Sequence, residues 1–476
     1  MAFLRVEKKK SGTYLRIIET YRNEGRVKHK TLYTLGKAED YTPVQLQAIA
    51  KKLLQLAGLS YEDFVKSNAG LKELARYNYG YVLAVNKLWQ LFGLDKFSRI
   101  VSNRHKIKFD WTSVLKLMII ERLNEPGSKL RNYLTQEDYI GFEKKYELQY
   151  FYRTLDLLYK EEDFLKKHLF KQQRSIFSEN LDVVFYDVTT LYFDSQKEIE
   201  GNLRKKGYSK DGQARKVQIV LGLLVDKLRN PITYQIYEGN SYEGHTMIEA
   251  LETLTQNYNI DKAIVVADSA MIDKDNRDYI VGDKRLDFIL GDSIKKLPEN
   301  IQAFLLDKSN HKAISKDIDK EIFSYAETIY KDRRIICSYS EKRAKKDAYE
   351  REKLIAKATY WIENPSKFKQ VKKRGAGRFI QNSEGEFKLD LDKIEHDARF
   401  DGFKAIATTT DITAQELIDK YTDLYNVEHS FRTLKSQLEI RPVFHWTNTR
   451  IRGHIAMCFI AYAFLNYLRN VLHIIP

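Results

Sequence analysis

The sequence is poor in cysteine and has no long apolar segment at its start. Two cysteines occur among 476 residues, Cys337 and Cys458, and they do not form a Cys-x-x-Cys pair. Their scarcity excludes a zinc ribbon and a disulfide framework, and it agrees with a reducing cytosol. The first residues, MAFLRVEKKK, lack the apolar core of a signal peptide. We therefore expect a soluble, intracellular protein.

Long hydrophobic runs, internal repeats and low-complexity segments are also missing. The longest apolar stretch, IAMCFIAYAFLNYL from Ile455, is too short to cross a bilayer and predicts a buried helix. Hydrophobic residues make up 43% of the chain, which suffices for a sizeable core and speaks against global disorder. The length predicts about three domains.

Basic residues outnumber acidic ones. The chain has 80 Lys and Arg against 65 Asp and Glu, a formal net charge of +15. Such a surplus favours a polyanionic partner but says nothing about the fold. Nucleic acid is one explanation and a generic basic surface is the other, so charge alone does not decide between them.

The first part of the chain predicts a small β module followed by helices. YLRIIETYRNEGRVKHKTLYTLG has the alternation of two strands joined around Asn23-Glu24-Gly25, and basic residues lie at their edges. A helix follows, TPVQLQAIAKKLLQLAG, which begins at Thr42-Pro43 and ends at Gly58. We assign residues 1–38 to a basic β module, with DNA-end recognition as its candidate role, and residues 39–180 to a helical DNA-binding or linker region.

From residue 181 the pattern becomes that of a mixed sheet. Strand-like runs first follow one another and then alternate with helices, which is typical of an α/β fold. We expect 181–293 and 401–476 to be two parts of one catalytic domain, the second containing an amphipathic helix and a C-terminal helix. The strongly charged stretch 294–400 interrupts this rhythm and predicts an insertion domain.

Three acidic residues are the most informative feature of these segments. Asp187 lies inside the apolar run VVFYDVTTLYF, Asp268 closes the run AIVVAD, and Glu428 lies on the amphipathic helix YTDLYNVEHSFRTLKSQLEIRP. An unpaired carboxylate in a buried strand is costly, so such acids are usually paired, hydrogen-bonded or bound to a metal. We therefore expect them to converge on one cation site. The alternatives are that Asp268 caps the next helix and that Asp187 binds a neighbouring loop.

The helix that carries Glu428 has a clear periodicity. Its apolar residues recur every three or four positions and form one stripe: Leu424, Val427, Phe431, Leu434 and Leu438. Tyr421, Glu428 and Lys435 are seven residues apart, so a continuous helix would present them in a row along the rim of that stripe. An ordinary solvated face is the alternative.

These residue types suit metal-assisted phosphoryl transfer on DNA. Three carboxylates provide the hard oxygen ligands that Mg²⁺ or Mn²⁺ prefers, and a pair of such ions activates the attacking oxygen and stabilises the leaving one. Candidates for binding the DNA are then Tyr421, Lys435, Arg432 and Arg441. His245 and His429 are weaker candidates for ligands or bases, because single histidines are more often structural.

The same residues resemble the DDE-type transposases of bacterial insertion sequences. Their signature Tyr-x2-Arg-x3-Glu-x6-Lys corresponds here to Tyr421, Leu424, Glu428 and Lys435, so a leucine stands where the family has arginine. That arginine's role either passes to a nearby base such as Arg432 or is absent. The segments YDVTTLYF and VVADSAMIDKDN are similar to the family's first and second acidic motifs.

The resemblance implies an RNase H-like mixed sheet with flanking helices and a catalytic triad of Asp187, Asp268 and Glu428. It implies cut-and-paste transposition, in which water frees a 3′-hydroxyl at the element end and this hydroxyl attacks target DNA. The expected partners are double-stranded DNA, namely terminal inverted repeats and target, and a second copy of the chain. Stretch 294–400 is similar to the β-rich insertion of some members, and a hairpin intermediate is left open.

Further candidates for DNA contact lie in the loop KFKQVKKRGAGRF. Its basic residues surround two glycines, which let a backbone approach phosphates closely; they include Lys372, Lys373, Arg374 and Arg378. A solvated loop is the alternative. For the whole chain, two other hypotheses stay open: an RNase H-like nuclease that cuts without joining, and a DNA-binding regulator derived from a transposase whose catalytic site is no longer used.

Overall fold

The computed structural model describes residues 2–23, 26–58, 60, 76–142, 145–177, 181–209, 212–213, 215–258, 260, 262–269, 274–315, 322–364, 375–383 and 386–472. The chain divides into two compact units, Met1–Arg76 and Tyr77–Pro476.

The first unit is a small antiparallel sheet followed by one helix. Within its described residues the sheet has three strands in the order β1-β2-β3: Ala2–Lys9, Gly12–Asn23 and Arg26–Lys37. The sequence pattern predicted β2 and β3 and missed β1. Helix α1, Pro43–Leu56, begins as expected, because the Thr42 side chain accepts a hydrogen bond from the Gln45 amide in a capping box.

The second unit begins with a helical region. Its helices are α3 Gly80–Leu91, α4 Leu94–His105, α5 Trp111–Asn124, α6 Lys129–Leu134, α7 Leu148–Lys160 and α8 Glu162–Phe177. They share one apolar core with the C-terminal helix α16, Asn448–Leu472, which packs against α5, α7 and α8. The large side chains Trp89, Trp111 and Phe151 are buried in this core.

Among the helices that the structure describes, α16 is long and apolar enough to cross a membrane by length and composition alone. It has 25 residues, so the sequence-based estimate of its length was too short. Of its most apolar window, 61% is buried inside the protein. The predicted buried helix is thereby confirmed.

The rest of the second unit is built on a mixed sheet, as expected. Its described strands number nine, in the order β6-β5-β4-β7-β8-β14-β11-β10-β9. Strand β7 pairs in parallel with β4 and with β8, and the other neighbours are antiparallel. The strands are β4 Val183–Tyr192, β5 Gln218–Val225, β6 Pro231–Glu238, β7 Ala263–Ala267, β8 Leu286–Asp292, β9 Lys312–Ser315, β10 Ile322–Tyr330, β11 Arg333–Tyr339 and β14 Phe403–Thr408.

Helices cover both faces of this sheet. On β4, Val184 and Tyr186 belong to the core beneath α9, Thr246–Asn257, and α10, Lys274–Gly282. Phe185 points to the opposite face and shares a core with α14, Ala414–Thr422, and α15, Tyr425–Arg432. Because side chains alternate along a strand, Asp187 lies on the α14–α15 face with Phe185.

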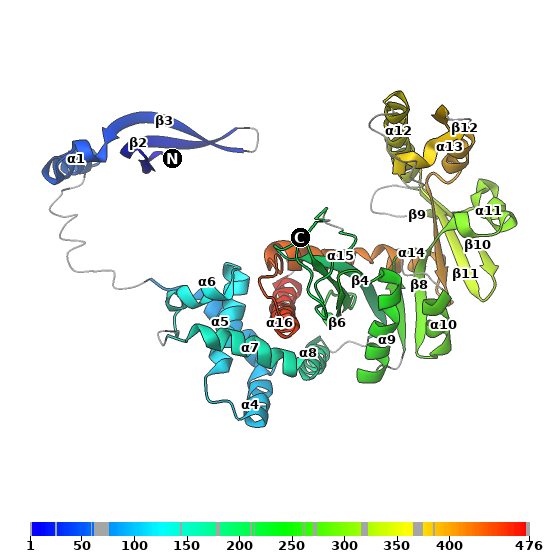
Figure 1. Cartoon of the computed structure of the whole chain (residues 1–476), viewed down its shortest axis with the longest axis horizontal. Helices are drawn as coiled ribbons and strands as arrows, with labels where there is room; N and C mark the ends of the chain where they lie inside the picture. The colour runs from blue at the N-terminus through cyan, green and yellow to red at the C-terminus, as the bar shows by residue number, and fades with distance from the viewer. Residues whose placement is uncertain are drawn as a thin grey trace. The chain divides into compact units, whose positions relative to one another are not determined.

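The charged stretch 294–400 contributes to the same sheet and adds a separate small cluster. Strands β9, β10 and β11 extend the sheet beyond β14 (Figure 1). Helix α12, Glu341–Glu363, packs against the hairpin of β12, Ile380–Ser383, and β13, Glu386–Leu389, through a core that includes Phe379 and Ile380. The stretch also contains α11, Glu299–Leu306, and α13, Leu391–Ala398. It is therefore of mixed helix and strand composition.

Candidate active site

Two of the expected acidic residues lie on neighbouring strands, Asp187 midway along β4 and Asp268 directly after β7. In the parallel pair of β4 and β7, Val184 lies opposite Val265 and Phe185 opposite Val266. Continuing this register by two residues brings Asp187 level with Asp268, the residue that directly follows β7. Ligands of α/β sheets bind at such carboxyl ends. The two aspartates thus lie side by side at the carboxyl end of β7, on strands that are far apart in the sequence.

The third acid, Glu428, lies on a helix that is broken where the sequence predicted continuity. Helix α14 ends at Thr422, α15 runs over Tyr425–Arg432, and a π-helical turn follows at Thr433–Gln437. The predicted apolar stripe is confirmed: Leu424, Val427, Phe431, Leu434 and Leu438 are all buried. Packing of this stripe against the sheet therefore holds α15 and the π-helical turn in place.

The breaks interrupt the predicted row of Tyr421, Glu428 and Lys435, which assumed one continuous helix. Tyr421 is only 4% exposed, and its hydroxyl donates to Asp268 Oδ1 at 3.4 Å. Glu428 is exposed on α15, and Lys435 is half-buried in the π-helical turn. Tyr421 is therefore a buried hydrogen-bond donor to Asp268 and does not lie on an exposed rim.

The burial expected for the two strand acids is not observed at Asp268 and is only partial at Asp187. Asp268 and Glu428 are exposed, and Asp187 is half-buried, so solvent offsets most of the desolvation cost that motivated the prediction. Asp268 Oδ1 also accepts from the Ser269 amide at 2.7 Å. The helix that Asp268 was expected to cap would involve residues 270–273, outside the described residues.

A buried carboxylate that we did not single out lies on the next strand. Asp292 ends β8 and forms an ion pair with Arg333 at 2.9 Å, and both side chains are at most 8% exposed. Burial raises the pKa of the Asp292 carboxyl above its ordinary value. The sequence signal was available, because Asp292 closes an apolar run just as Asp268 does.

Gly291 leaves the space through which Tyr421 reaches Asp268. The register of β7 and β8 pairs Ala267 with Leu290, so Gly291 lies beside Asp268. A Cβ atom added at Gly291 would lie 2.3 Å from the Tyr421 hydroxyl oxygen. Glycine is therefore required here for close approach of a side chain, which no local pattern in the sequence shows.

Lys404 is a second residue that sequence reasoning missed. It lies on β14, half-buried, with Nζ 4.3 Å from the centre of the Tyr421 ring. Burial lowers the pKa of Lys404 and the nearby Arg343 lowers it further, whereas the Asp268 and Glu428 carboxylates act in the opposite direction. A lysine inside the apolar strand FKAIATTT was the available signal.

The same charges act on Tyr421. Burial raises its pKa well above the ordinary value, and Asp268 and Glu428 raise it further while Arg343 opposes them. The hydroxyl therefore stays protonated and remains a hydrogen-bond donor to Asp268. Asp268, Glu428, Tyr421, Lys404 and Arg343 thus form one electrostatic neighbourhood.

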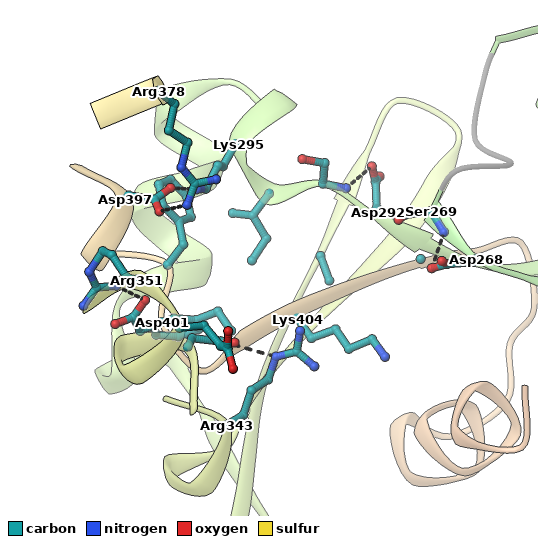
Figure 2. Close-up of a pocket in the computed structure, with 18 of the residues that line it drawn as sticks. Asp268, Ser269, Asp292, Lys295, Arg343, Arg351, Arg378, Asp397, Asp401 and Lys404 are labelled. Carbon is teal, nitrogen blue, oxygen red and sulfur yellow. Dashed lines mark hydrogen bonds and ion pairs between the residues drawn. The ribbon is translucent and has the colours of Figure 1, made fainter. Parts of the chain in front are cut away.

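A cavity of about 500 Å³ opens beside this neighbourhood (Figure 2). It lies between the sheet edge at Asp268 and residues of α12 and α13. Several of its charged groups are paired: Arg378 Nη2 lies 2.7 Å from Asp397, Lys295 also pairs with Asp397, and Arg351 pairs with Asp401. Arg378, a predicted DNA contact, therefore lines the cavity and is engaged with an acid.

The other predicted DNA contacts are more scattered. Arg432 is exposed on α15, and the Arg441 guanidinium lies 5.3 Å from the centre of the Tyr192 ring. Lys372, Lys373 and Arg374 lie outside the described residues. Their contact with DNA stays a prediction.

His429 is buried beside Glu428, with Arg229 Nη1 at 3.1 Å from its Nδ1 atom. Burial and the surrounding arginines lower the pKa of His429 to about 4. The ring is therefore neutral near pH 7, and its burial beside Arg229 agrees with a structural role.

The three predicted carboxylates fit a hard divalent cation in their chemistry. The strand register places Asp187 opposite Asp268. The carboxylates of Asp268 and Glu428 both raise the pKa of Lys404. Carboxylate oxygens are the ligands that such cations prefer. Within the part of the chain that the structure describes, no three His, Cys, Asp or Glu side chains converge on one point. A three-carboxylate site therefore requires Glu428 and the aspartates to draw together.

Comparisons with known proteins show similarity to transposases. Residues 179–464, more than half of the chain, match the Transposase DDE domain, and residues 4–63 match the N-terminal domain of IS1634 family transposases. One similar solved structure is a piggyBac transposase synaptic complex with hairpin DNA, at 9% identity and a TM-score of 0.39 over 77% of this chain and 67% of that chain. Curated protein sequences gave no match. The chain belongs to the DDE transposases, DNA phosphoryl-transfer enzymes of insertion sequences.

Proposed function

We propose that this transposase cuts the ends of its insertion sequence by metal-dependent hydrolysis and then joins the freed 3′ ends to target DNA. The observation that carries the proposal is the strand register that brings Asp187 level with Asp268. The exposed Glu428 influences the same Lys404 and Tyr421 side chains as Asp268 does. Asp187, Asp268 and Glu428 would bind Mg²⁺ or Mn²⁺, and we propose that two ions bind. Such ions, when bound, supply activation of the attacking oxygen and stabilisation of the leaving oxygen.

In the first reaction, a water oxygen bonds to the phosphorus at the element end and the bond from phosphorus to the 3′ oxygen breaks. The products are a 3′-hydroxyl on the element and a 5′-phosphate on the flank. In the second, that 3′-hydroxyl attacks a target phosphorus and displaces a target 3′ oxygen. Tyr421 positions the Asp268 carboxylate for both steps through its hydroxyl.

The proposed partners are DNA and a second copy of the chain, and the proposed compartment is the bacterial cytosol. The net charge of +15 supports DNA as the polyanion, both as terminal inverted repeats and as target. Joining two ends in one event requires two active sites, so we propose a homodimer on DNA. We also propose that the protein acts in the bacterial cytosol, since both described cysteines are free and buried.

The test compares the wild type with Glu428→Gln on a labelled duplex that carries the element ends, with and without Mg²⁺. Because Glu428 is exposed, the substitution removes a charge without opening the core. We expect the wild type to cut and join only with the metal, and Glu428→Gln to bind DNA with at least about a hundredfold lower cleavage. Equal cleavage by both proteins would show that Glu428 is structural. Cutting without joined products would identify a nuclease.

A further inference from the structure

The position where related transposases carry the signature arginine cannot supply a cation here. Leu424 occupies it, and its side chain is 9% exposed within the main apolar core. It lies directly before α15, where it begins the buried stripe under Glu428. The site must therefore obtain this positive charge from another element, or do without it.

Lys404 is placed to supply it. Its side chain shares a strand face with Ile406, which packs in the core beneath α14, and its ammonium lies over the Tyr421 ring. Figure 2 shows the Lys404 side chain between Arg343 and Asp268. Among the described residues, Lys404 forms no ion pair, although Asp268 and Glu428 are close enough to influence it.

Arg343 brings a second cation to the same place from a different element. It lies near the start of α12. Its Nε atom is 3.5 Å from Asp347 Oδ2, a long distance for an ion pair. The other cations of the cavity, Lys295, Arg351 and Arg378, are paired more closely with Asp397 or Asp401.

Two adjacent positive charges beside an open cavity form an arrangement that an anion would stabilise. Arg343 disfavours the charged state of Lys404, and a phosphate between them removes that repulsion and gains charge-assisted hydrogen bonds. The cavity of about 500 Å³ has room for a phosphodiester group with its sugar. The residues that line this cavity include Asp268, so an anion bound there lies next to the proposed metal ligands.

We propose that Lys404 and Arg343 bind one DNA phosphate beside Asp268 and thereby replace the arginine that the signature lacks at Leu424. This inference rests on the proposed function, because DNA is the anion that the site would meet. Two elements supply the pair, β14 and α12, so the stretch 294–400 takes part in the active site through Arg343.

The test uses element-end duplexes in which one phosphate at a time, near the cut, is replaced by an uncharged methylphosphonate. Binding is measured in EDTA, so that no metal contributes. For the wild type, one replacement should weaken binding about tenfold, the loss expected for a charge-assisted contact. Lys404→Ala should bind the normal duplex more weakly than the wild type does. It should also bind the normal duplex and the duplex with that methylphosphonate equally well. Lys404→Arg should restore discrimination, which excludes a folding defect as the cause.

The matched control is Lys262→Ala. Lys262 is an exposed lysine at the opposite end of the same sheet, paired with Asp287, and its removal should leave discrimination at the wild-type level. Discrimination by Lys404→Ala equal to that of the wild type would overturn the inference, as would a wild type that never discriminates. Neither result touches the proposed function, which fails only if the wild type does not cleave the unmodified duplex with Mg²⁺.

Discussion

At the scale of single residues, the site depends on contacts between positions that are distant in the chain. Tyr421 reaches Asp268 because Gly291, on the intervening strand, has no side chain. Asp268 was predictable because an acid that closes an apolar run lies at a strand end. Gly291 was not, since it matters only through a residue of α14 that the fold brings near. For Lys404 the one signal was a lysine inside an apolar strand.

Replacing Gly291 by alanine tests this dependence. The added methyl group would overlap the Tyr421 hydroxyl, which must move away from Asp268. We expect cleavage by Gly291→Ala to fall about tenfold or more, as is usual when a positioning contact is lost. Tyr421→Phe removes the hydrogen bond without the overlap and is the matched comparison. Full activity of both variants would show that Asp268 needs no support from Tyr421.

The position of Leu424 allows a second test. Leu424→Arg would restore the family signature, but it would place a guanidinium in the apolar core. We expect a loss of roughly 2 to 4 kcal/mol in the free energy of unfolding and no gain in cleavage. Denaturant unfolding and the cleavage assay measure the two effects. A more active and equally stable variant would contradict the placement of Leu424 in the core.

At the scale of elements, the predicted sheet is correct because its strands are continuous apolar runs bounded by turns. The helix with Glu428 shows the limit of such patterns. Its apolar stripe continues across Asp423 and through the π-helical turn, so periodicity alone predicts one helix. Turns of π-helix are common at functional sites, and here the turn carries Lys435 on the chain segment directly after Glu428. The local backbone geometry follows from packing, which the sequence pattern does not encode.

At the scale of the whole second unit, the core between the helical region and α16 contains buried polar groups. His445 and His454 lie with ring centres 5.3 Å apart, near Lys129 and Arg122. Burial and these cations lower the pKa of His445 to about 3, and they lower that of His454 well below its ordinary value. Both rings are therefore neutral in the folded protein near pH 7.

The two histidines make stability depend on pH. Between their unfolded pKa of about 6.5 and the lowered folded values, the unfolded chain binds protons that the folded protein does not. Stability is therefore fully present above about pH 6.5 and falls as the pH drops, by up to about 1.4 kcal/mol per pH unit for each histidine.

Denaturant unfolding of the wild type and of His445→Gln from pH 7.5 to 4.5 checks this dependence. The variant should show a shallower slope, because one of the two proton-binding differences is gone. His396→Gln, which removes an exposed histidine of α13, is the matched control. Parallel slopes for all three proteins would exclude His445 as a source of acid sensitivity.

The packing of α16 has a consequence for how the protein is made. The helices between residues 77 and 177 leave the ribosome first, yet the core around Trp89 and Trp111 is closed by the last helix of the chain. A nascent or prematurely terminated chain therefore exposes this apolar surface and cannot complete the second unit. A chain that lacks α16 therefore cannot form an active enzyme, and its exposed apolar surface makes it a target for proteolysis.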